Sequence, residues 1–168
     1  MKNRIVYALI FALIIFLISC HDQNNPLTTS SNLSNDQLAR NTLMRFLNSL
    51  HNGEFAQAAQ LYGGVYQTML DQNLGVSPND HAALFHHACT QNGMQCLQVN
   101  SVILDKKISD VEYLYKVAFL QDDGTPFVLE PCCGSDDVGV SSQQAFYFTV
   151  VEMDPGKFVV LDLPPYVP

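Results

Sequence analysis

Apolar residues recur with a helical period through the first half of the chain. Ser34 and Gln37 form a capping-box pair, and the residues that follow are apolar at every third or fourth position, which is typical of a helix with one buried face. Ser77 and Pro78 predict a later helix start, with serine at the cap and proline at the first helical position. The predicted helices cover residues 34–52, 54–62, 65–73 and 77–91.

From Leu97 onward apolar and polar residues alternate, which predicts β-strands. Residues 122–124, Asp-Asp-Gly, and residues 154–157, Asp-Pro-Gly-Lys, predict tight turns between them. Helices followed by a meander of antiparallel strands are typical of an α+β domain, which is the fold class that we expect. The predicted strands cover residues 97–104, 111–120, 125–130, 143–153 and 158–163.

The start of the chain has a different pattern. A positively charged beginning precedes an uninterrupted apolar run over residues 5–18. This run fits a secretory signal and is short for a membrane span, which needs about 20 apolar residues. Residues 17–20, LISC, resemble a bacterial lipobox, which implies that Cys20 receives a diacylglyceryl group and becomes the mature N-terminus. We therefore expect a lipoprotein signal peptide over residues 1–19.

Residues 20–33 comprise the lipidated cysteine and a polar segment rich in Asn, Ser and Thr, which we interpret as a flexible tether. The α+β domain is expected over residues 34–163, and a proline-rich tail over residues 164–168. The expected location is the cell envelope, with the domain anchored by lipid to a bacterial membrane and facing the periplasm or the exterior. His21 rather than Asp follows the lipidated cysteine, which favours the outer membrane in a Gram-negative organism.

The charge balance narrows the range of partners. The leader contains two of the eight basic residues and none of the sixteen acidic ones, so the mature chain has a formal charge of −10. Such a surface repels phosphate backbones, and we expect no nucleic-acid partner. It also opposes electrostatic docking on anionic lipid, which leaves the lipid anchor as the membrane contact.

Residues 53–62, GEFAQAAQLY, follow the first predicted helix. Together the two segments resemble the opening of nuclear transport factor 2-like domains, in which a helix precedes a glycine, an acidic residue, an aromatic residue and two alanines. The resemblance covers residues 34–163. It implies N-terminal helices packed on a curved antiparallel sheet of four to six strands, shaped as a cone with a pocket at its wide end. Another α+β domain, such as a cystatin-like or pilotin-like fold, is the main rival.

Aromatic residues at strand spacing are candidates to line such a pocket, although most residues of this kind belong to a core. Enzymes with this fold place an acid or base in the cavity. The sequence contains no matching motif, so we assign no catalytic residue and expect no cofactor. The pocket candidates are Tyr113, Tyr115, Phe119, Phe146, Tyr147 and Phe148.

Four cysteines follow Cys20, and an even number in an oxidising compartment favours disulfides. The candidates are Cys89, Cys96, Cys132 and Cys133. Because adjacent cysteines bond to each other only through a strained ring, we expect Cys132 and Cys133 each to pair with one of the other two. The alternative is a local Cys89–Cys96 bond, with the adjacent cysteines separate.

A thiolate-rich metal site is a weaker alternative for the same cysteines. His86 and Cys89 lie three residues apart on a predicted helix, so they share a face. With Cys132 and Cys133 they would suit zinc or copper(I). We favour exposed histidines beside oxidised cysteines, and expect no bound metal.

These observations predict a membrane-anchored cell-envelope lipoprotein without enzymatic activity. It is expected to bind a small apolar ligand or an envelope protein, through its pocket or through the face of its sheet. Two alternatives remain, which are a cyclase-type or isomerase-type enzyme of the same fold and metal capture by the His/Cys cluster.

Overall fold

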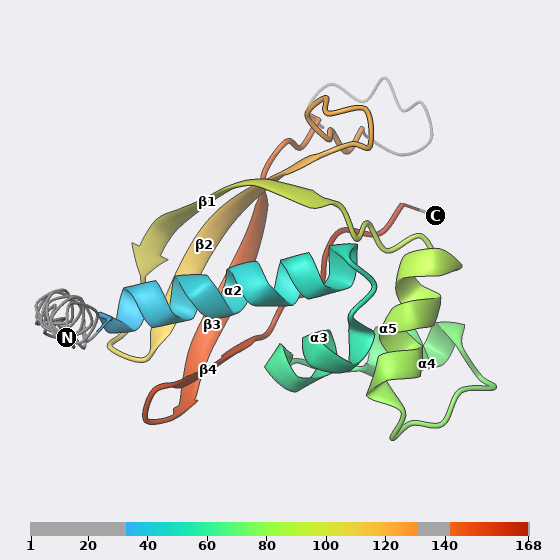
Figure 1. Ribbon diagram of the computed structural model, residues 1–168, viewed down its shortest axis with the longest axis horizontal. Coiled ribbons are helices and arrows are strands. Elements are labelled where there is room, and N and C mark those ends of the chain that lie inside the picture. Colours follow the sequence, from blue (N-terminus) through green and yellow to red (C-terminus); the bar gives the residue numbers. More distant parts are fainter. Residues whose placement is uncertain (1–32, 131–141, 168) are drawn as a thin grey trace, which may run out of the picture. The chain divides into compact units, whose positions relative to one another are not determined.

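The computed structural model describes residues 33–130 and 142–167. The helices are α2 (Asn35–His51), α3 (Phe55–Leu61), α4 (Gln67–Gln72) and α5 (His81–Thr90). The strands are β1 (Gln98–Lys107), β2 (Glu112–Leu120), β3 (Phe146–Asp154) and β4 (Lys157–Val160). The strands form an open antiparallel sheet in the order β1-β2-β3-β4 (Figure 1). The predicted α+β class, with helices before an antiparallel sheet, is confirmed.

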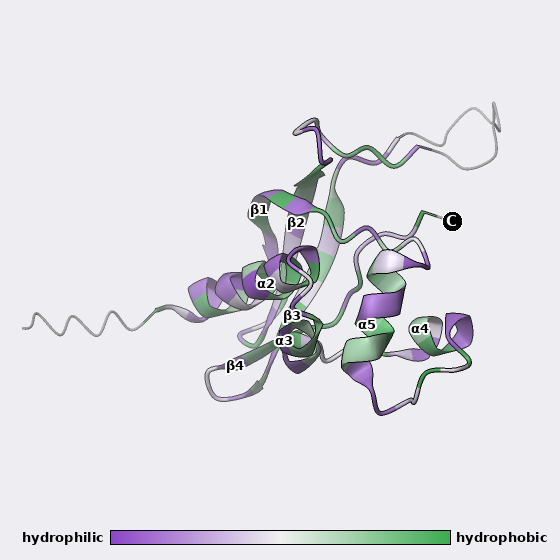
Figure 2. Cartoon of the chain, turned by 45° about the vertical axis from the view of Figure 1, so that its right-hand side comes forward, coloured by the Kyte–Doolittle hydropathy of each residue, from purple (hydrophilic) through white to green (hydrophobic). Residues whose placement is uncertain are grey.

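Helix α2 lies across the sheet and contacts all four strands (Figure 1). It begins as the sequence predicts, since the side-chain oxygen of Gln37 accepts a hydrogen bond from the N–H of Ser34 at 3.1 Å. It ends where Gly53 adopts a φ of 75°, a conformation that favours glycine. Figure 2 shows hydrophilic and hydrophobic positions alternating around this helix. Its buried apolar residues are Ala39, Leu43, Phe46, Leu47 and Leu50.

The paired residues of β2 and β3 alternate between a buried face of the sheet and an outer face. Tyr115 pairs with Phe148, and both side chains are buried on the side of α2. The adjacent pair, Lys116 and Tyr147, is exposed on the opposite side, because successive side chains of a strand point to opposite faces. The hydroxyl of Tyr115 donates to the backbone carbonyl of Asp36 at 2.7 Å, which ties the centre of the sheet to the start of α2.

Both edges of the sheet are protected against pairing with another chain. Tyr62 forms a parallel bridge with Val160, and the N–H of Gly63 donates to the carbonyl of Val160 at 2.9 Å, so this segment covers β4. At the other edge, β1 contains two register shifts and ends in the charged residues Asp105, Lys106 and Lys107. Irregular pairing and charge are common ways to prevent edge-to-edge aggregation.

The start of α5 differs from the prediction. Asp80 is the cap, and its side chain accepts a hydrogen bond from the N–H of Ala83 at 3.0 Å. Ser77, the predicted cap, instead begins a turn in which its carbonyl accepts from the N–H of Asp80 at 2.9 Å. A carboxylate three residues before a free helical N–H is as good a cap as serine, and here it shortens the helix by one turn.

The predicted strand at residues 125–130 is wrong. Pro126 and Leu129 form isolated bridges, with Leu120 and Gln143 respectively, and no regular ladder joins them. Proline lacks the N–H that a ladder needs, which explains why the pairing is interrupted.

The last strand, predicted over residues 158–163, ends at Val160. Beyond it the side chain of Asp162 accepts from the N–H of Thr149 at 2.6 Å, replacing the backbone carbonyl that a longer strand would supply. The expected tail also packs on the domain over residues 164–167. The carbonyl of Pro165 accepts from the N–H of Gln95 at 2.8 Å, and the N–H of Val167 donates to the carbonyl of Gly93 at 2.9 Å.

A substitution of Gly64 tests the close approach of the segment that covers β4. A methyl group on Gly64 would clash with the carbonyl oxygen of Leu161 and the hydroxyl of Tyr62. Gly64→Ala is expected to lower the free energy of unfolding by about 1–3 kcal/mol, as measured by urea denaturation. Gly75→Ala is the matched control, since nothing lies within 4 Å of the added methyl, and its effect should stay within about 0.5 kcal/mol. If the two variants unfolded at the same urea concentration, the close approach of this segment to β4 would be contradicted.

Candidate functional site

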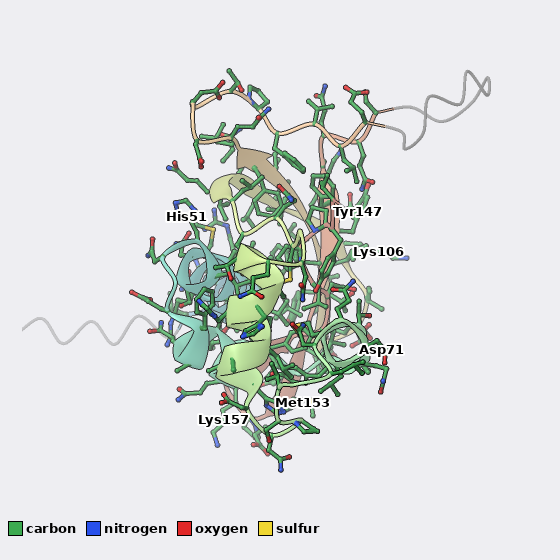
Figure 3. The ribbon with its side chains drawn as sticks, turned by 90° about the vertical axis from the view of Figure 1, so that its right-hand side faces the viewer. His51, Asp71, Lys106, Tyr147, Met153 and Lys157 are labelled. Carbon is green, nitrogen blue, oxygen red and sulfur yellow. A yellow bond between two sulfur atoms is a disulfide. The ribbon has the colours of Figure 1, made fainter. Side chains whose placement is uncertain are left out.

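The structure divides the six predicted pocket residues between two faces of the sheet. Tyr147 is 50% exposed on the outer face, where Figure 3 shows it on the same side as Lys106. The other five are between 0% and 6% exposed and pack in the core beneath α2. Strand alternation explains this division, because it points Tyr147 away from its two neighbours in β3. Whether any of the six candidates lines a ligand pocket stays a prediction. The five core residues are Tyr113, Tyr115, Phe119, Phe146 and Phe148.

The strongly shifted pKa values in the described residues belong to buried phenols. Burial raises the pKa of Tyr66 to about 12. Burial, followed by the charge of Asp36, raises the pKa of Tyr115 to about 12. Burial, followed by the neighbouring Tyr66, also raises the pKa of Tyr62. A general acid or base works best with a pKa near the operating pH, so these phenols are packing groups that remain protonated at neutral pH.

Cys89 and Cys96 form a disulfide, with their Cα atoms 5.6 Å apart. This bond is the alternative pairing considered above. The expected pairing of Cys89 and Cys96 with Cys132 and Cys133 is wrong. Proximity explains the outcome, since the two cysteines are seven residues apart and lie on either side of the turn that follows α5. Cys132 and Cys133 lie outside the described residues.

The disulfide also bears on the weaker metal alternative. An oxidised Cys89 offers no thiolate to a metal ion, so it cannot join His86 as the proposed ligand. Within residues 33–130 and 142–167, no three His, Cys, Asp or Glu side chains come together in a metal-binding arrangement.

The lipobox, Cys20 and the leader lie outside the described residues, as does the tether up to residue 32. Among the helices that the structure describes, none combines the length and the apolar character needed to cross a membrane.

A surface hollow of about 590 Å³ lies between the starts of α3 and α5. A second hollow of about 420 Å³ shares three lining residues with it and extends towards the end of α2 and the disulfide. We call the two hollows together the α3–α5 groove. The first is lined by Gly53, Glu54, Phe55, Ala56, Gln57, Asp80, Ala82, Ala83 and His86. The second is lined by Leu50, His51, Asn52, Gly53, Phe55, His86, Cys89, Thr90 and Cys96.

The walls of the groove are held by the core. Phe85 of α5 is fully buried, and its ring lies 5.9 Å from that of Phe46 on α2 and 5.4 Å from that of Tyr62. At the start of α3, the N–H of Glu54 donates to the carbonyl of the buried Ser49 at 2.7 Å. Both helices therefore have a defined position relative to α2, and the groove between them is preformed.

The groove combines an apolar floor with acidic rims. Phe55 and His86 pack edge to face across it, with ring centroids 5.3 Å apart, and the small side chains of α5 leave the space open. Glu54 and Asp80 are exposed at its margins on opposite walls. At the other end, His51 Nδ1 lies 3.2 Å from the carbonyl oxygen of Cys96. Such a surface can hold an apolar side chain and a polar or cationic group beside it.

None of the sequence patterns described above predicts this groove. The signal available was a stretch of the chain, residues 46–105, that contains no lysine or arginine although it includes Glu54, Asp80 and four histidines. This stretch supplies every residue that lines the groove. The net charge of the whole mature chain does not show this local lack of cations.

Comparisons with protein-family models, with curated proteins and with solved structures give no match for this chain. The class that the geometry defines is an α+β domain with an open, four-stranded antiparallel sheet and a surface groove between two of its helices.

The disulfide can be tested by stability and by chemistry. Replacing Cys89 and Cys96 by serine is expected to lower the free energy of unfolding by about 2–3 kcal/mol, because the unfolded chain loses a short closed loop. The Cys132→Ser/Cys133→Ser variant is the control, and it should leave Cys89 and Cys96 protected from alkylation of the unreduced protein. Peptide mapping that links either Cys89 or Cys96 to residue 132 or 133 in the natural chain would contradict the pairing.

Proposed function

We propose that the chain is a lipid-anchored cell-envelope lipoprotein whose α+β domain binds another envelope protein through the α3–α5 groove, without catalysing a reaction. The observation that carries this proposal is the preformed groove beside a filled core. An open surface hollow with an apolar floor suits a protruding segment of a protein. A small apolar ligand is a poorer fit, since such ligands favour deep cavities that bury most of their surface.

The lipid anchor is supported by the sequence pattern at the start of the chain. A charged beginning, an apolar run and the LISC segment occur in the order that lipoprotein processing needs. Acylation on Cys20 with more than one chain would give a stable anchor. In this proposal the domain faces the periplasm or the exterior, and in a Gram-negative cell it belongs to the outer membrane.

A nuclear transport factor 2-like plan is part of the proposal. It is supported by α2 lying across one face of the antiparallel sheet, and by the Gly53 turn that leads directly into α3. In the described part of the chain the core is filled by side chains, whereas that family has an open cone with a pocket. Without such a pocket there, a binding function towards a partner protein is favoured over a cyclase-type or isomerase-type enzyme. An enzyme would need a poised acid or base in a cavity, whereas the strongly shifted groups described here are packed phenols.

The anchor is tested by replacing the lipidated residue. In a bacterial host, the natural chain is expected in the membrane fraction with a mass that corresponds to an acylated chain beginning at Cys20. Cys20→Ser should retain the leader and lack the acyl groups, because processing depends on lipidation of the cysteine. Ser19→Ala, which keeps a small residue at that position, is the matched control and should behave as the natural chain does. Identical processing of Cys20→Ser and the natural chain would refute the anchor.

The groove is tested by photo-crosslinking in intact cells. A photoreactive amino acid at Gln57, which lines the groove, is expected to give a discrete crosslinked protein band. The same amino acid at Tyr147, on the outer face of the sheet, is the control and should not give that band. Ala83→Trp fills the groove from the opposite wall and should abolish the crosslink from Gln57 while the protein remains folded. A crosslink that survives this substitution, or one found equally at Tyr147, would place the contact elsewhere.

A further inference from the structure

Resting on the proposed function of the groove, we infer that its occupant is a basic peptide segment of the partner, with an arginine or lysine side chain held between Glu54 and Asp80. The two carboxylates come from opposite walls, one at the start of α3 and the other at the start of α5. Both residues line the same hollow, so a cationic side chain bound there lies near both carboxylates.

The two acidic residues have no cationic partner within the described part of the chain. The ion pairs found there join Lys107 to Asp110 at 2.8 Å and Lys157 to Asp154 at 3.7 Å, both away from the groove. Residues 46–105 contain no lysine or arginine at all. The negative charge of Glu54 and Asp80 is therefore available to a ligand, and complementary charge steers and selects partners.

The floor of the groove fits the rest of a long cationic side chain. Arginine and lysine bury their apolar stems and keep the charged end in a polar environment. Ala82 and Ala83 leave room for the stem, and Phe55 offers an aromatic ring to a cation. The hollow of about 590 Å³ has space for such a side chain together with the backbone that carries it.

The helix dipoles act against a cation, but with smaller charges. The start of α5 has a partial positive charge, equivalent to about half a unit, and the seven-residue α3 contributes less. Asp80 already accepts a hydrogen bond from Ala83, which neutralises part of that field. The two carboxylates together outweigh these partial positive charges, so a phosphate group or an acidic peptide is the disfavoured occupant.

The test measures binding of defined peptides to the full chain, purified in a nonionic detergent. One fluorescent peptide carries a Leu-Arg-Leu core, and its partner carries citrulline in place of arginine. Citrulline has nearly the same shape without the charge, so a difference in affinity reports the charge itself. The arginine peptide is expected to bind about three- to tenfold more tightly, as two partly exposed ion pairs allow, and added salt should reduce the difference.

Two variants with the same net charge show which carboxylates cause the preference for the arginine peptide. Glu54→Gln/Asp80→Asn keeps the hydrogen-bonding shape of both side chains, including the helix cap, and should remove the preference for arginine. Asp71→Asn/Asp105→Asn changes the net charge by the same amount at exposed positions outside the groove, and should preserve the preference. Equal loss in both variants would show that net charge alone attracts the peptide, and would overturn the inference.

The remaining outcomes separate this inference from the proposed function. If both peptides bind equally and Ala83→Trp abolishes both, the groove binds peptides without selecting a cation, so the inference is wrong and the proposed function stands. If neither peptide binds at any soluble concentration, the inference is wrong. In that case the photo-crosslink from Gln57 decides about the proposed function, which is retained if the crosslink forms and rejected if it does not.

Discussion

Helix α2 packs against the inner face of the sheet, and this contact supports both the core and the groove. Leu43 and Phe46 are fully buried there, and Phe46 also contacts Tyr62 and Phe85, with ring centroids 5.8 and 5.9 Å away. One helix therefore connects the sheet to the shorter helices that form the groove. Because replacing a buried aromatic side chain by a small one costs several kcal/mol, loosening this contact would weaken the packing of the shorter helices as well as that of α2.

The same packing decides where a ligand can bind. The inner face of the sheet is occupied by aromatic side chains that contact α2, such as Tyr115 and Phe148, so the space that an open cone would offer is filled. The end of α2 and the starts of α3 and α5 meet at the surface, where Gly53 and the exposed Glu54 line a hollow. The proposed binding site is therefore a surface groove and not an interior cavity, and a groove suits a protein segment more than an enclosed small molecule.

Local patterns predicted the main elements, and tertiary contacts explain the errors. The period of α2 and the alternation of β2 are properties of neighbouring residues, and both elements were predicted nearly to the residue. Asp80 and Ser77 are both suitable caps for α5, and the local sequence does not decide between them. The Cys89–Cys96 bond depends on the turn that brings the two cysteines together. No local pattern predicts the groove, because its two walls are separated in sequence and meet only in the folded chain. The lack of lysine and arginine over residues 46–105 is the signal that the sequence contains.

The proposed function requires that a protein partner in the cell envelope cover the α3–α5 groove. Hydrogen exchange tests it most directly, by comparing the chain in native membranes with the chain purified in detergent. The account predicts slower exchange in native membranes at residues 53–57 and 80–86, with no change on the outer face around Tyr147. Equal exchange at the groove in both preparations, or protection confined to the outer face of the sheet, would contradict the account.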